Sequence, residues 1–100
     1  MVDPELEALR REFLAEANDK VHEMELSAAR LSPESLARLT HLAHQLKGSG
    51  GSYGFQLISD EASEVETAIE DGMLTLRMDC WMKVMKGITT MEQMIRETSA

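Results

Sequence analysis

The sequence is poor in the residues that hold small secreted proteins and β-sandwiches together. Its 100 residues include one cysteine, two prolines and four aromatic residues. The single Cys80 cannot form an internal disulfide, so the fold does not depend on an oxidising compartment. So few aromatic residues suit helices packed through leucine, alanine and methionine better than a sheet sandwich.

Long apolar segments are missing as well. No apolar run approaches the roughly 18 residues that a membrane span needs. No basic segment followed by an apolar one resembles a secretory leader. We therefore expect no signal peptide, no membrane partner and a cytoplasmic location.

Positive charge is scarce. Ten Lys and Arg residues stand against 18 Asp and Glu residues, for a formal net charge of −8. Proteins that bind nucleic acid need a basic face, so this class is excluded, whereas a basic protein surface is compatible with the charge. The length and the 43% of apolar residues predict a single domain over residues 1–100 with a modest core.

Four helices are predicted from start signals and from apolar residues at helical spacing. Asp3 and Ser32 are each followed by proline and glutamate, an order typical of an N-cap, a first helical position and a first turn. The predicted ranges are about 4–31, 33–52, 56–70 and 74–97. Because short connections make successive helices antiparallel, the predicted fold class is all-α, an antiparallel up-down four-helix bundle.

Apolar residues at helical spacing mark the faces that we expect to be buried. On the third predicted helix, Ser59, Ser63 and Glu66 fall to another side. Gly87 interrupts the last apolar stripe, where it permits a close helix contact or a slight bend. The expected core residues outside the second helix are Leu6, Leu9, Phe13, Ala17, Met24, Ala28, Leu31, Phe55, Leu57, Ile58, Ala62, Val65, Ile69, Met78, Trp81, Met85, Ile88, either Met91 or Glu92, and Ile95.

The second predicted helix carries three glycines that helix stability does not explain. Gly48, Gly50 and Gly51 each cost about 1 kcal/mol relative to alanine. His44 lies outside the apolar stripe of this helix, which runs through Leu36, Leu39, Ala43, Leu46 and Gly50. Small residues predominate among the neighbours of His44 on the helix surface, which are Ala37, Thr40, His41, Lys47, Gly48 and Gly51.

This pattern predicts that the imidazole of His44 is exposed, that mostly small side chains surround it, and that the Lys47 ammonium group lies beside it. A neutral imidazole is nucleophilic through the nitrogen that carries no proton, and a hydrogen bond to the other nitrogen selects the tautomer. Phosphoryl transfer needs an in-line approach and positive charge near the phosphoryl oxygens. Small residues let a partner's active site press close to His44, and Lys47 is placed to hold a phosphoryl oxygen.

The residues around His44 resemble the motif of the histidine-containing phosphotransfer (HPt) domains of two-component signalling. The family pattern has histidine, any residue, leucine, lysine, glycine, a small residue and a later glycine. Here it is read in His44, Gln45, Leu46, Lys47, Gly48, Ser49 and Gly54. The resemblance implies that His44 is the phosphoacceptor, that Lys47 and Gly48 surround it and that Gly54 forms the turn into the next helix.

Glu66 stands 22 residues after His44, where the family usually carries a polar side chain that faces the histidine. The resemblance implies that Glu66 accepts a hydrogen bond from Nδ1 of His44 and leaves Nε2 free to attack. The alternative is a solvated acid on an exposed helix face.

The resemblance also implies the partners. A receiver domain or a histidine kinase donates the phosphoryl group, and a receiver aspartate with its bound Mg²⁺ removes it. No cofactor is expected on this chain, which acts as a phosphocarrier and not as an enzyme. Gln45, beside His44, is a candidate contact to a docked partner, and His41 is interpreted as a surface neighbour of the site.

Three alternatives stay open. His41 and His44 do not fit a di-iron pattern, since no Glu-x-x-His tetrad is present. A metal site made by these two histidines alone is the first alternative, but it would not explain the glycines or Lys47, so no metal is predicted. A helical adaptor without phosphotransfer would use the glycines for packing alone. The chain is also compatible with the phosphoacceptor segment of a larger chemotaxis-type or hybrid kinase, although Met1 and the polar tail favour a free-standing protein.

Overall fold

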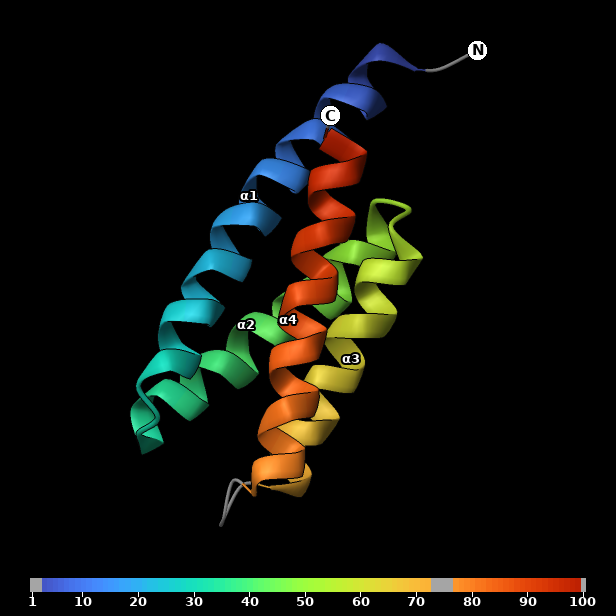
Figure 1. The fold of residues 1–100 in the computed structure, drawn as a ribbon. Helices are drawn as coiled ribbons and strands as arrows, with labels where there is room; N and C mark the ends of the chain where they lie inside the picture. The colour runs from blue at the N-terminus through green and yellow to red at the C-terminus, as the bar shows by residue number, and fades with distance from the viewer. Residues whose placement is uncertain (1–2, 73–76, 100) are drawn as a thin grey trace.

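The computed structural model describes residues 3–72 and 77–99, and these form a bundle of four helices (Figure 1). The prediction of an all-α fold is confirmed, and the described residues contain no strand. Each helix packs against two others, with α1 next to α2 and α4 and with α3 next to α2 and α4. The helices are α1 (Pro4–Ala29), α2 (Pro33–Ser52), α3 (Gln56–Asp71) and α4 (Met78–Ser99).

The first two helices begin where the sequence predicts. The Asp3 side chain accepts a hydrogen bond from the backbone N–H of Glu5, and Pro4 opens α1. At the start of α2, Ser32 Oγ accepts from the N–H of Ser35 at 3.1 Å, and Ser35 Oγ accepts from the N–H of Ser32 at 2.7 Å. This reciprocal capping box satisfies N–H groups that the helix itself leaves without partners.

One apolar cluster fills the bundle, and most of the expected core residues belong to it. The prediction was wrong for Leu6, Leu9 and Leu31, which are exposed. The first turns of α1 project beyond the end of α4, so this end of α1 is covered less than the rest (Figure 1). Leu6 and Leu9 are 47% and 46% exposed. Leu31 lies in the connection that follows α1.

The prediction was also wrong for Leu57 and Met78, which are 70% and 72% exposed. Ile58 takes the core position at the start of α3, so its neighbour Leu57 points outward. The buried stripe of α4 is rotated from the expected one, since Trp81 and Met85 lie at its edge and are only partly buried. The stripe consists of Cys80, Val84, Ile88, Met91 and Ile95.

The boundaries of the last helix differ from the expected ones. The predicted start at Leu74 lies outside the described residues, and α4 as described begins at Met78. Arg77 precedes the helix, and its carbonyl accepts the first helical hydrogen bond, from Trp81 N at 2.8 Å. The expected close helix contact at Gly87 is confirmed, because an added Cβ there would overlap the side chain of Val65 on α3.

Candidate functional site

His44 stands on the outer surface of α2 with its side chain 72% exposed. The small neighbours predicted around it leave it accessible. A Cβ added to Gly48 would meet no described atom within 4 Å, and a Cβ on Gly51 would make an ordinary contact with Ser59 Oγ at 3.7 Å. Ala37, His41, Gly48 and Gly51 are exposed, and Thr40 and Gln45 are partly exposed.

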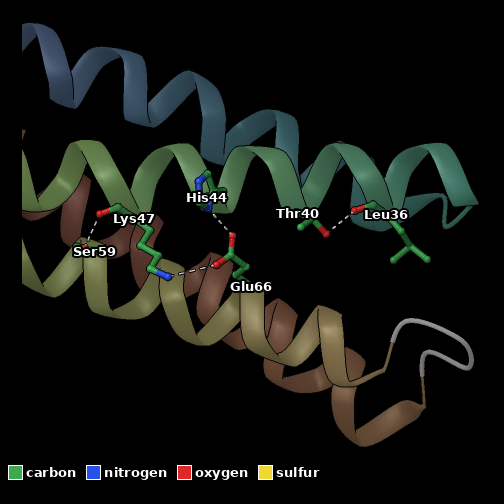
Figure 2. Close-up of polar contacts among 6 residues, drawn as sticks. All are labelled: Leu36, Thr40, His44, Lys47, Ser59 and Glu66. Atoms are coloured by element: carbon green, nitrogen blue, oxygen red, sulfur yellow. Dashed lines mark hydrogen bonds and ion pairs between the residues drawn. The ribbon is translucent and has the colours of Figure 1, made fainter.

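Glu66 reaches His44 from the neighbouring helix α3. Its Oε2 lies 2.9 Å from Nδ1 of His44, and its side chain is only 12% exposed (Figure 2). The alternative of a solvated acid on an open helix face is therefore wrong. A carboxylate that is largely withdrawn from water makes a stronger hydrogen bond than one in bulk solvent, since the local dielectric constant is lower.

Lys47 contacts the same carboxylate through its second oxygen. Lys47 Nζ lies 3.4 Å from Glu66 Oε1, and its side chain is about half exposed (Figure 2). Glu66 thus connects the imidazole and the ammonium group, which lie one helical turn apart on α2. The long N–O distance and the exposure of Lys47 leave this ion pair easy to exchange for another anion.

The two helices approach closely because glycine and serine meet between them. A Cβ on Gly50 would lie 3.0 Å from the backbone nitrogen of Ser59 and 3.2 Å from the carbonyl oxygen of Phe55. Ser59 is buried, and its Oγ donates a hydrogen bond to the carbonyl of Lys47 at 2.6 Å (Figure 2). These contacts hold α3 against the part of α2 that carries Lys47.

Sequence analysis missed the part that Ser59 plays. The apolar pattern placed Ser59 away from the core side of α3, together with Glu66. The two residues are seven positions apart, so they lie on one face of the helix, and that face packs against α2. The signal available in the sequence was a serine seven residues before Glu66, and therefore on the same side of the predicted helix.

The turn between α2 and α3 fixes the relative position of the two helices. Gly54 has φ of +85°, so the predicted left-handed conformation at the helix exit is confirmed. Tyr53 and Phe55, on either side of this glycine, both stack on Phe13 of α1 with ring centroids 5.3 Å apart. The expected packing of Phe55 against the core is confirmed, because the turn is anchored to α1 by these rings.

Residues 8–100 match the family model described as Hpt domain. The chain belongs to the Hpt domain family. No curated protein and no solved structure matches it. Hpt domains are phosphocarrier modules of phosphorelay signalling, so a phosphotransfer-related role follows for this Hpt domain from the family alone. The helical bundle described above agrees with that assignment.

The described part of this Hpt domain shows no cluster of three or more His, Cys, Asp or Glu side chains placed to hold a metal ion. His41 and His44 share a helix, yet the partner of His44 is the Glu66 carboxylate. Among the described helices, none combines the length and hydropathy that crossing a membrane requires.

Two carboxyl groups away from His44 have shifted pKa values. On α1, the pKa of Glu25 is raised, first by a hydrogen bond with Glu92 of α4 and then by burial and by the negative charge of Glu92. On α3, burial and the neighbouring charge of Glu64 raise the pKa of Glu61. His44 is not among the causes of either shift.

Proposed function

We propose that this Hpt domain accepts a phosphoryl group on His44 and passes it to or from an aspartate of a response-regulator receiver domain. The observation that carries the proposal is the exposed imidazole whose Nδ1 lies 2.9 Å from a largely buried carboxylate. An ionised carboxylate only accepts hydrogen bonds, so the Nδ1 proton of His44 points to Glu66. Nε2 then holds the free electron pair and faces the partner.

The proposed reaction needs no group on this chain beyond the imidazole and its neighbours. The electron pair of Nε2 forms a bond to phosphorus while the bond from phosphorus to the donor oxygen breaks. The donor leaves as an aspartate carboxylate when it is a receiver, or as ADP when a histidine kinase supplies ATP. The Nδ1 proton stays on the ring, and the positive charge of the phosphorylated ring is stabilised by Glu66.

Lys47 and the small residues serve the approach of the partner. When a phosphoryl group arrives, Lys47 exchanges its contact with Glu66 for a phosphoryl oxygen. Gly48 and Gly51, with Ala37 and Thr40, leave room for the receiver's active site and its Mg²⁺. His41 and Gln45 lie at the rim, where they are placed to contact the docked protein.

The same chemistry defines partners and location. The proposed partners are receiver domains and a histidine kinase, and no nucleic acid or membrane is involved. We place the protein in the cytoplasm, where ATP-dependent kinases and receivers operate. Receiver contacts of this transient kind bury interfaces at the small end of the usual range, so we expect moderate affinity.

The test is phosphorylation of His44→Gln beside the unchanged protein, with receiver domains encoded nearby as donors and acceptors. The unchanged protein should gain a label that is labile in acid and stable in base, whereas the variant should gain none. Circular dichroism verifies that both are folded. Label retained by the variant would move the acceptor to His22 or His41, which are both accessible. Absence of label in the unchanged protein would contradict the proposed function.

A further inference from the structure

A groove of about 1000 Å³ runs between the first half of α1 and the last turns of α4. Most of the α1 and α4 residues around it are exposed, so it is a surface feature and not an enclosed cavity. Its floor is apolar and its edges are basic. The residues that give it this character are Leu14, Phe55, Ile95, Arg10, Arg11 and Arg96.

The arginines of this groove are not equivalent. Arg11 pairs with Glu7 at 3.2 Å, and Arg96 pairs with Glu92 at 2.6 Å, each with a glutamate four residues earlier on its own helix. Arg10 has no carboxylate partner among the described residues. In a chain of net charge −8, the groove therefore presents an unneutralised cation above an apolar floor.

Arg10 is held in place by an aromatic ring. Its guanidinium carbon lies 4.8 Å from the centroid of Phe55, a distance typical of cation–π contacts. Its Nε is shielded from solvent and finds no hydrogen-bond acceptor within the described part of the chain. Because the guanidinium is already oriented and partly dehydrated, a carboxylate brought to its outer N–H groups gains more than it would at a mobile surface arginine.

We infer that this groove docks an acidic amphipathic helix of a partner protein. Grooves between helices accept an amphipathic helix that places its apolar side chains on the floor. Apolar residues of the partner lie against the floor, where Phe55 is partly exposed and Leu14 and Ile95 keep 6% and 2% of their surface, and its carboxylates pair with Arg10. The described residues contain no strand, so an extended peptide has no sheet edge to join there.

The groove and His44 use different pairs of helices. The groove is lined by α1, by α4 and by Phe55 of the turn before α3. His44 and its contacts lie on α2 and α3 (Figure 2). We therefore expect a partner bound in the groove to leave the surface around His44 accessible. The inference goes beyond the proposed phosphotransfer, because it assigns a second surface to a second partner.

The probe is a fluorescein-labelled amphipathic peptide of about 18 residues, long enough to form a helix, with leucine on one face and glutamate on the other. Its matched control carries lysine in place of every glutamate. Fluorescence anisotropy with the full chain should show binding of the acidic peptide at least about tenfold tighter than binding of the basic one. The affinity should fall as salt is raised, because added ions screen the charges.

Variants of the protein locate the binding. Arg10→Glu should weaken binding of the acidic peptide at least about tenfold, and Arg10→Gln should weaken it less. Arg77→Glu is the matched control, since it makes the same charge change at an exposed arginine next to the start of α4 and should bind like the unchanged protein. Phosphorylation of His44 in Arg10→Glu should be unchanged, which separates this test from that of the proposed function.

Three results would overturn the inference. The first is equal binding of the acidic peptide to Arg10→Glu and to the unchanged protein. The second is a set of NMR shift changes on α2 and α3 instead of around Leu14 and Ile95. The third is a sedimentation profile showing that the unchanged chain is a dimer and Arg10→Glu a monomer, because a second copy of the chain would then occupy the groove.

Discussion

Two faces of the bundle are built in contrasting ways. Where α2 meets α3, glycine and serine bring backbone atoms together, so that a Cβ on Gly50 would lie 3.0 Å from Ser59 N. Where the first half of α1 faces the end of α4, larger side chains surround a groove of about 1000 Å³. Close approach fixes short polar contacts such as that of Glu66 with His44. An open groove instead leaves room for another molecule.

The largest expected effect comes from filling the close contact. Gly50→Leu forces its side chain against the backbone of Ser59 and Phe55, and we expect a loss of about 3 kcal/mol in the free energy of unfolding, measured in urea. Gly48→Leu is the matched control, because a Cβ there meets no described atom within 4 Å. It should leave stability unchanged or raise it by up to about 1 kcal/mol.

The Gly48→Leu variant also distinguishes an effect on stability from an effect on the access of a receiver to His44. Gly48→Leu should remain folded and yet transfer phosphoryl groups poorly with a receiver, because its side chain stands beside His44. If both leucine variants lost the same stability, the contrast between the two glycines would be wrong. If Gly48→Leu transferred phosphoryl groups at the normal rate, the receiver would not need small residues beside His44.

A smaller effect is expected at the carboxylate that α3 contributes. Glu66→Ala removes the acceptor of the Nδ1 proton of His44, a hydrogen bond to a charged group worth about 1.5–3 kcal/mol. If that energy is lost in the transition state, phosphorylation of His44 slows by about ten- to a hundredfold. Rapid-quench kinetics measure the rate, and ¹⁵N shifts of the imidazole report the tautomer. Unchanged kinetics would return Glu66 to a packing role.

Ser59→Ala tests the contact that supports the carboxylate. Loss of the hydrogen bond to the carbonyl of Lys47 should cost about 1 kcal/mol of stability. It should also slow phosphorylation of His44, by less than Glu66→Ala does, with the imidazole ¹⁵N shifts moving in the same direction. Ser63→Ala, one turn further along α3, is the matched control. Equal effects of the two serine variants would show that Ser59 does not position Glu66.

The smallest effect on stability is expected from the contact of Glu25 on α1 with Glu92 on α4. The raised pKa of Glu25 means that its carboxyl contributes stability below its ordinary pKa of 4.5, and this contribution is lost as the pH rises through the raised value. Glu25→Gln should therefore raise Tm at pH 7 and make no difference below about pH 4. Because Glu25 is largely hydrated, the gain stays below about 1 kcal/mol. Glu16→Gln, exposed on α1, is the control for net charge.

The sequence was sufficient where a local signal determines the structure. The caps at Asp3 and Ser32 and the left-handed Gly54 are confirmed because each depends on residues within one turn. The residues expected around His44 do surround it, because helical spacing alone determines which side chains share a surface. Their roles in transfer stay predictions that the variants above examine.

The sequence was not sufficient where the neighbour comes from another helix. Leu6 and Leu57 have the spacing of core residues, but Leu6 lies near the projecting start of α1, and Ile58 takes the core position that was expected for Leu57. Ser59 and Arg10 were missed for the same reason, since their contacts are with Lys47 and Phe55. A single sequence does not show which residues of different helices lie close together in the folded chain.

The residues proposed for the chemistry all lie between His44 and Glu66, in one helical hairpin whose turn is fixed at Gly54. The outer helices, α1 and α4, support this hairpin from outside and carry none of those groups. Exposed positions of α1 and α4 are therefore suitable places to attach a label, because the hairpin that holds the reactive residues stays unchanged.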